Sequence, residues 1–226
     1  DKPDNMANPK TKLTAELMEG FRYAYINRGI FFLLFLLSVT AILIRPYIDL
    51  VPGISDQIFD MGAEGLSILL SSTGLGAMVG GILLALRGKI MGLTKIFTWS
   101  LLISALAMLL FVVSGNIWFG SALIAIVGMT IVAGSITSQT LIQNTVDPKV
   151  RGRVISITAA LSWGMPAIGA VLMGWIAEFL GLSVTLASGA ALTLLLWIWG
   201  HNASTRFENT LESRDFANEV KLAPKN

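Results

Sequence analysis

The chain has 226 residues, of which 54% are hydrophobic and only 13% are charged. Soluble domains are about 25% charged, so this composition excludes an ordinary soluble protein and indicates a membrane protein. The net charge of +2 is too small to indicate nucleic-acid binding, and the absence of cysteine excludes a disulfide framework and a thiolate metal site.

Six long apolar runs follow one another along the chain. Each is close to the roughly 20 residues that a helix needs to cross the hydrocarbon core of a bilayer. None alternates between apolar and polar residues, which excludes a transmembrane β-barrel. The sequence therefore predicts an all-α integral membrane protein with six transmembrane helices, over residues 30–48, 65–86, 92–114, 117–143, 154–180 and 182–200.

The segment before the first run is amphipathic. Leu13, Leu17 and Phe21 recur every four residues, and charged residues occupy the other faces. This pattern predicts a short helix with two possible placements: at the membrane surface, or packed as a linker on the basic loops. The predicted domains are a cytoplasmic linker over 1–28, a six-helix bundle over 29–201 and a cytoplasmic polar tail over 202–226.

The positive charges occupy alternate gaps between the runs. All of the 16 Lys and Arg residues except Arg45 lie before the first run, after the second, after the fourth or after the sixth. Loops that hold Lys and Arg stay in the cytoplasm because their translocation is unfavourable. We therefore expect both termini on the cytoplasmic side.

Arg45 lies near the outer end of the first run, and a charged residue within a span is a functional candidate. Asp49 follows one turn later. Two roles are open for this arginine. It extends outward and pairs with Asp49, or it faces a cavity and meets an anionic substrate or another part of the protein.

The second run carries small residues on one helical face. Ser72, Gly76 and Gly80 recur every four residues, a spacing that lets a neighbouring backbone approach closely. We expect helix packing at this face. The third and sixth runs are apolar almost all round and are expected at the lipid-facing periphery.

The fourth run carries a polar stripe in its cytoplasmic half. Ser135, Gln139 and Gln143 share one helical face. A stripe that faced lipid would leave its amide groups unsatisfied, so it faces protein or water. It lines a substrate cavity or inner gate, or it holds neighbouring helices together by hydrogen bonds.

The fifth run begins with Arg151 and Arg153, after Asp147 and Pro148. An acidic residue and a proline are ordinary helix-start residues, and the arginines anchor the topology. Pro166 is expected to kink the helix because it removes a backbone hydrogen bond. Trp163, close to it, faces a cavity or packs at a helix contact.

The stretch Asp-Pro-Lys-Val-Arg-Gly-Arg-Val-Ile-Ser at 147–156, followed by Pro166 and Gly169, is the most recognisable part of the chain. It resembles the junction of the tenth and eleventh helices in major facilitator superfamily transporters, in the branch that includes bacterial siderophore and macrolide exporters. The segments at 17–28, 45–52 and 74–81 resemble parts of the same half. The loop at 87–92 departs from the family motif because it lacks its Asp.

The resemblance implies the C-terminal half of a twelve-helix exporter, built as a 3+3 inverted repeat and working by alternating access. It implies a bacterial inner membrane location, an N-terminal six-helix half as partner, and a small-molecule substrate. No carboxylate lies in the middle of a span, so any proton coupling depends on that other half. The expected substrate cavity comprises Ser38, Arg45, Ser135, Gln139, Gln143 and Trp163, and the expected cytoplasmic gate comprises Asp147, Arg151 and Arg153.

Two other functions are open to a six-helix membrane protein. A self-contained transporter or channel that acts as a homodimer is the alternative, with two copies in place of two halves. An intramembrane serine protease is disfavoured because Ile68 follows Ser67 where that chemistry needs glycine, and because His201 lies outside the core. No phosphate-binding loop motif is present, and we expect neither an enzyme activity nor a cofactor.

Overall fold

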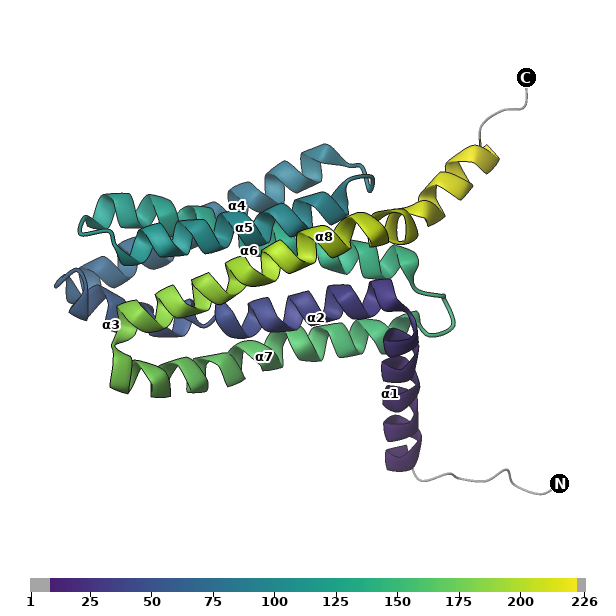
Figure 1. The fold of residues 1–226 in the computed structure, drawn as a ribbon, viewed down its shortest axis with the longest axis horizontal. Coiled ribbons are helices and arrows are strands. Elements are labelled where there is room, and N and C mark those ends of the chain that lie inside the picture. Colours follow the sequence, from purple (N-terminus) through teal and green to yellow (C-terminus); the bar gives the residue numbers. More distant parts are fainter. Residues whose placement is uncertain (1–8, 223–226) are drawn as a thin grey trace.

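The structure is a computed structural model that describes the backbone of residues 9–222 and the side chains of residues 18–202 and Leu211. All regular elements in this part of the chain are α-helices. In order they are α1 (Pro9–Ile26), α2 (Arg28–Leu43), α3 (Tyr47–Gln57), α4 (Gly62–Arg87), α5 (Leu93–Val112), α6 (Ile117–Thr145), α7 (Arg151–Leu180) and α8 (Leu182–Leu222) (Figure 1).

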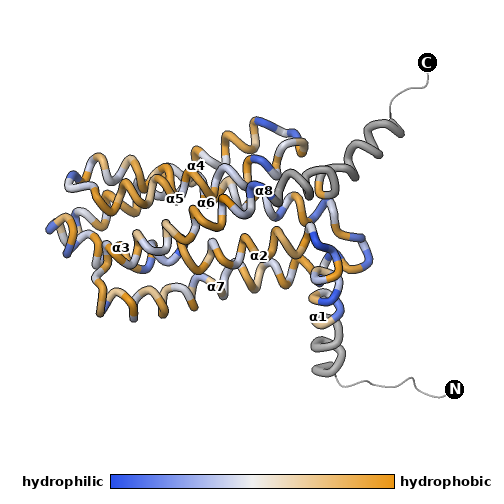
Figure 2. The backbone as a smooth tube through the Cα atoms, viewed as in Figure 1, coloured by the Kyte–Doolittle hydropathy of each residue, from blue (hydrophilic) through white to orange (hydrophobic). Residues whose placement is uncertain are grey.

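Six segments are long and apolar enough to cross a membrane, which confirms the predicted all-α, six-span fold. They lie side by side as one bundle (Figure 1), and hydrophilic residues gather towards its two ends (Figure 2). The candidate spans are Arg28–Gln57, Gly62–Arg87, Leu93–Val112, Ile117–Thr145, Arg151–Leu180 and Leu182–Asn202.

The first predicted span, over 30–48, is divided in the structure. Helix α2 ends at Leu43, and α3 begins at Tyr47 and continues to Gln57. Pro46 has no N–H and cannot continue the hydrogen-bond ladder of α2. A tighter bond, from the Tyr47 N–H to the Ile44 carbonyl at 3.2 Å, closes the turn instead. The break leaves Arg45 in a turn within the bundle.

Helix α4 packs directly on the backbone of α6 at the small-residue face. A Cβ added to Gly76 would collide with the backbone of Ala125, and a Cβ added to Gly80 would lie 2.5 Å from the Met129 carbonyl oxygen. Ser72, one turn earlier, is half-buried. Such close approach is how helices associate where lipid offers no hydrophobic drive.

A second set of glycine contacts joins α2 to α7 and α8. A Cβ on Gly169 of α7 would lie 2.5 Å from the Ile42 carbonyl oxygen, and a Cβ on Gly189 of α8 would lie 2.6 Å from that of Leu43. Exchanging α2, α4 and α5 with α6, α7 and α8 preserves the packed pairs α4–α6 and α2–α7, α5–α6 and α2–α8, and α5–α8. The exchange is incomplete, because α8 also packs on α6 and α7, whereas α5 does not pack to a comparable extent on α2 or α4.

Two apolar clusters fill the interior, one towards each end of the bundle. On α2 the first cluster extends to Leu36, and the second begins at Ile44; on α5 the first extends to Leu101, and the second begins at Ala107. The layer between the clusters holds the polar groups described below. The functional candidates therefore lie about halfway along the bundle.

Helix α5 has one exposed face, as expected of a helix at the periphery, and one buried face that the sequence did not indicate. Phe97, Leu101 and Met108 are buried, whereas Trp99, Ile103, Leu106 and Leu110 are exposed. A run that is apolar all round has no periodicity to mark its buried side. The contacts with α6 and α8 decide which face is covered.

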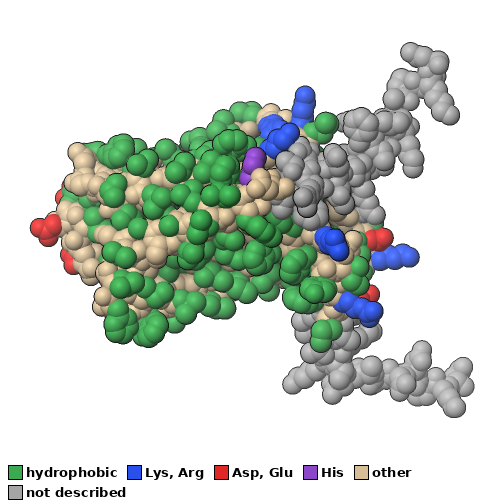
Figure 3. All heavy atoms as spheres, in the orientation of Figure 1, with side chains coloured by type: hydrophobic (Ala, Val, Ile, Leu, Met, Phe, Trp, Pro, Cys, Tyr) green, Lys and Arg blue, Asp and Glu red, His purple; other side chains and the backbone are tan. Residues whose placement is uncertain are grey.

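The charged side chains distinguish the two ends of the bundle. Lys and Arg side chains gather at the end where α1 lies, with a few acidic ones among them, whereas the charged side chains visible at the opposite end are acidic (Figure 3). This agrees with the alternate-gap pattern in the sequence, from which the basic end is predicted to lie on the cytoplasmic side.

We predict that Gly76→Ala destabilises the protein because its Cβ would displace the backbone of α6. Such overpacking should lower the free energy of unfolding by about 1–3 kcal/mol, and therefore the thermal midpoint in detergent by about 3–10 °C. Gly81→Ala is the matched control on the same helix, since nothing lies within 4 Å of the added Cβ. Equal midpoints for the two variants would contradict the packing role of Gly76.

Candidate functional site

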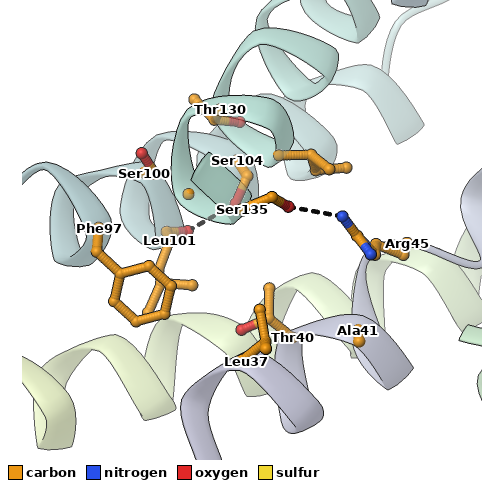
Figure 4. Close-up of a pocket in the computed structure, with 12 residues that line it drawn as sticks. Leu37, Thr40, Ala41, Arg45, Phe97, Ser100, Leu101, Ser104, Thr130 and Ser135 are labelled. Carbon is orange, nitrogen blue, oxygen red and sulfur yellow. Dashed lines mark hydrogen bonds between the residues drawn. The ribbon is translucent and has the colours of Figure 1, made fainter. Parts of the chain in front are cut away.

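Arg45 lies in the turn between α2 and α3, and its guanidinium is directed into the bundle. One nitrogen, Nη1, donates to the Ser162 carbonyl at 2.9 Å, and Nη2 donates to the Ser135 hydroxyl at 2.6 Å. Figure 4 shows the second of these bonds. The arginine therefore links the turn after α2 to both α6 and α7.

The Ser162 carbonyl is available because of Pro166. In an α-helix the N–H of residue 166 would donate to the carbonyl of residue 162, and proline has no N–H. Helix α7 nevertheless includes Pro166 in its range, Arg151–Leu180. The carbonyl is part-buried, where a missing partner is costly, and Arg45 supplies the missing donor. Sequence reasoning missed Ser162, although a proline four residues later was the signal.

Of the two roles open for Arg45, the geometry favours the one in which it faces inward. Asp49, on the first turn of α3, is exposed. Arg153 and Glu19 of the described residues form an ion pair, whereas Arg45 and Asp49 do not. A charge at mid-bundle is expensive unless its donors are satisfied, and two of them are satisfied here.

A cleft of about 410 Å³ opens beside Arg45, among α3, α6 and α7. Its volume is within the range of small-molecule sites. Its lining combines aromatic and aliphatic surface with one cation, one carboxylate, hydroxyls and an amide, a mixture that suits an amphipathic ligand. The lining residues are Arg45, Ile48, Asp49, Ile131, Ser135, Ser138, Gln139, Thr158, Ser162, Trp163 and Pro166.

The cleft brings together four of the six predicted cavity residues. Gln139 and Trp163 are exposed beside Arg45 and Ser135, and the Trp163 side chain is 83% exposed. Gln143 is exposed one turn further along α6 and is not part of the lining. Ser38 is half-buried, and its hydroxyl donates to the Leu34 carbonyl of its own helix at 2.7 Å.

A smaller cavity of about 30 Å³ lies beside the Arg45–Ser135 pair, among α2, α5 and α6 (Figure 4). Ser100, Ser104 and Thr130 line it, and each hydroxyl donates to a carbonyl of its own helix. The volume is sufficient for a water molecule. This polar layer separates the two apolar clusters.

Helix α1 packs on the start of α7 at the basic end. Arg153 forms an ion pair with Glu19 at 2.6 Å, and a Cβ on Gly20 would lie 3.0 Å from the Arg153 Cβ. Figure 1 shows α1 crossing the end of the bundle at a steep angle to α2 and α7. This face of α1 packs as a linker on the basic loop.

The other face of α1 is apolar and exposed, as a helix at a membrane surface requires. Met18, Phe21 and Tyr25 are exposed on it. The side chains of Leu13 and Leu17 lie outside the described residues. The packing on α7 is that of a linker helix, and placement of the other face at the membrane surface stays a prediction.

The remaining predicted gate residues have local partners. The Asp147 carboxylate accepts from the Lys149 N–H at 3.0 Å, which forms a turn rather than a helix cap. Arg151 Nη2 lies 3.5 Å from the Val146 carbonyl. Val150 is the N-cap of α7 and provides no side-chain bond. Asp147, Arg151 and Arg153 thus lie together at the basic end.

A family model described as transmembrane secretion effector matches residues 2–224 of the chain. Macrolide efflux protein A of Streptococcus pyogenes, and the protein of the same name from its serotype M6, are each 27% identical over 171 residues. These matches cover 74% of this chain and 42% of each relative, so the chain spans less than half the length of these relatives. No solved structure matches significantly.

We predict that Pro166→Ala weakens the hold on Arg45. The new N–H at position 166 would donate to the Ser162 carbonyl and displace the Arg45 Nη1 bond. Phenylglyoxal modification of Arg45, followed by peptide mass spectrometry, should become faster by up to about tenfold. Pro52→Ala is the control, because Pro52 lies inside α3 and the new N–H would donate to the Ile48 carbonyl, which Arg45 does not bind. Equal modification rates in the two variants would refute the assignment.

Proposed function

Because the chain belongs to the transmembrane secretion effector family of the major facilitator superfamily, we propose that it is the C-terminal six-helix half of an exporter in the bacterial inner membrane. The half moves a small molecule outward together with a second six-helix unit. The observation that carries the proposal is the position of Arg45, held at mid-bundle between α6 and α7 beside an open cleft.

The cleft is proposed as one wall of the substrate path. Arg45, Gln139 and Trp163 offer a cation, an amide and an aromatic face on the same side of the bundle. Exposed polar groups on a transmembrane surface are costly against lipid, so this side is suited to a second unit and to water between the units. The matching relatives are described as macrolide efflux proteins, and we propose a large amphipathic substrate of that kind.

Export follows by alternating access, in which two six-helix units rock about a midplane site. The two bonds of Arg45 join the turn after α2 to α6 and α7. Exchange of one of these bonds for a contact to the substrate would loosen this link during transport. The basic end, with Arg151 and Arg153, serves as the cytoplasmic gate, and proton coupling depends on carboxylates in the second unit.

A homodimer of this chain is the second candidate. The exposed cleft side is equally suited to a second copy, since both arrangements cover the same polar groups. The two candidates differ in composition: one transport unit contains a different six-helix half, and the other contains two identical chains.

We predict that Arg45→Gln and Trp163→Ala each reduce macrolide efflux when the chain is co-expressed with the N-terminal half of a macrolide efflux relative. Loss of the charge-assisted bonds of Arg45 should lower the initial efflux rate about tenfold. Trp118→Ala is the control, since Trp118 is 70% exposed on α6 and does not line the cleft. Normal efflux by Arg45→Gln would refute the substrate-path assignment.

The same assay without the N-terminal half tests the composition of the transport unit. The half proposal expects little efflux from the chain alone, because its polar cleft lacks a partner. Efflux that depends on self-association, measured by cross-linking at matched expression, would establish the homodimer instead. Robust transport by the reconstituted monomer would refute both candidates.

We predict that Arg151→Gln with Arg153→Gln slows efflux severalfold while membrane insertion remains normal, since a gate needs its charges during transport. Glu19→Gln is the control that removes the ion pair to Arg153 and leaves both arginines in place. That pair is partly exposed, with side chains 31% and 58% accessible, and such pairs contribute about 0–1 kcal/mol. Unchanged efflux in the double variant would restrict the arginines to setting topology.

A further inference from the structure

A second hollow lies between α4 and α5, on the other side of α6 from the Arg45 cleft. It has a volume of about 360 Å³, and we call it the α4–α5 groove. Met129, Thr130 and Ala133 of α6 form its floor, whereas Ile131 and Ser135 line the cleft. At 3.6 residues per turn these two sets lie on opposite faces of α6. The groove is therefore separate from the proposed substrate path.

The groove is a consequence of the glycine contacts. Gly76 and Gly80 hold α4 directly against the backbone of α6. Consequently α4 packs on α3 and α6, while α5 packs on α6 and α8. The two helices are consecutive in the chain, yet a channel remains between their cytoplasmic halves.

The interior of the groove suits an apolar occupant. The hydroxyls of Ser100 and Thr130, which line it, already donate to carbonyls of their own helices. Leu83, Trp99 and Ile103 stand along its opening and are 57%, 48% and 39% exposed. The groove thus opens on the outer surface of a transmembrane bundle, where the available apolar molecule is the acyl chain of a lipid.

The mouth of the groove is basic. Arg87 lines it at the end of α4, and its Nη2 donates to the Met91 carbonyl at 2.7 Å. A guanidinium has five N–H donors, so this bond positions the group and leaves donors for an anion. Lys89 is exposed in the same segment, and no acidic residue occurs between positions 87 and 95.

We propose that the α4–α5 groove binds an anionic phospholipid from the leaflet at the basic end of the bundle. One acyl chain lies along Leu83, Trp99 and Ile103, and the headgroup phosphate accepts hydrogen bonds from Arg87. Lys89 adds attraction for the net negative charge of the lipid, as basic residues near an anionic leaflet do. The site does not depend on the transport role proposed above.

The test is native mass spectrometry of the full chain in a neutral detergent, titrated with phosphatidylglycerol or with phosphatidylcholine of the same acyl chains. Phosphatidylglycerol should bind at least about fivefold more tightly, and Arg87→Gln should remove about that factor. Lys149→Gln is the charge control, because Lys149 is an exposed lysine in the other basic loop. It should leave the preference unchanged.

Groove occupancy is tested by Leu83→Trp, which fills the channel and should reduce retention of both lipids. Leu86→Trp, on the same helix but outside the lining, is its control. Thermal midpoints and size-exclusion profiles identify any variant that fails to fold. If Leu83→Trp fails to fold, the proposal is tested by Arg87→Gln, because Arg87 is exposed and its substitution leaves the packing intact. Equal affinity for the two lipids, or an unchanged preference in Arg87→Gln, would overturn the proposal.

Discussion

Direct backbone contact at glycines is the constraint on which the arrangement of this bundle depends. A membrane offers little hydrophobic drive between helices, so their association requires close packing. Gly76 and Gly80 provide it between α4 and α6, and Gly169 provides it between α7 and α2. Where these contacts draw two helices together, their other neighbours are left further apart. The α4–α5 groove and the open side of α7 beside the cleft both result from these contacts, because α4 is drawn towards α6 and α7 is drawn towards α2.

Two prolines create the polar centre of the bundle, because each lacks the backbone N–H that a helix needs at its position. Pro46 cannot donate a backbone hydrogen bond, and the helix breaks there and turns Arg45 inward. Pro166 also cannot donate, but α7 continues through it and leaves the Ser162 carbonyl for the arginine. Each defect alone would leave a polar group without this hydrogen-bond partner in the middle of the bundle. Together they form a bridge across three segments, with Ser135 as its third member.

Local pattern in the sequence was sufficient for the spans, for the sidedness of charge and for the small-residue face of α4. It was not sufficient where the outcome depended on a partner far along the chain. Ser162 carries no chemical signature of its own, because its carbonyl rather than its hydroxyl forms the bond. Ser38 looked polar enough for a cavity but bonds to its own helix, and Gln143 continues the stripe beyond the end of the cleft. An apolar run such as α5 does not reveal which of its faces is covered.

The bridge at Arg45 also sets an order of events during synthesis. Its partners, Ser135 and Ser162, lie 90 and 117 residues later in the chain. At about 5–20 residues per second, the ribosome needs roughly 6–23 s after Arg45 to reach the second of them. Until Ser135 is synthesised, the first span carries a cation whose donors have neither partner. The nascent helix therefore depends on the insertion machinery, on water or on lipid headgroups to hold Arg45 until α6 and α7 arrive.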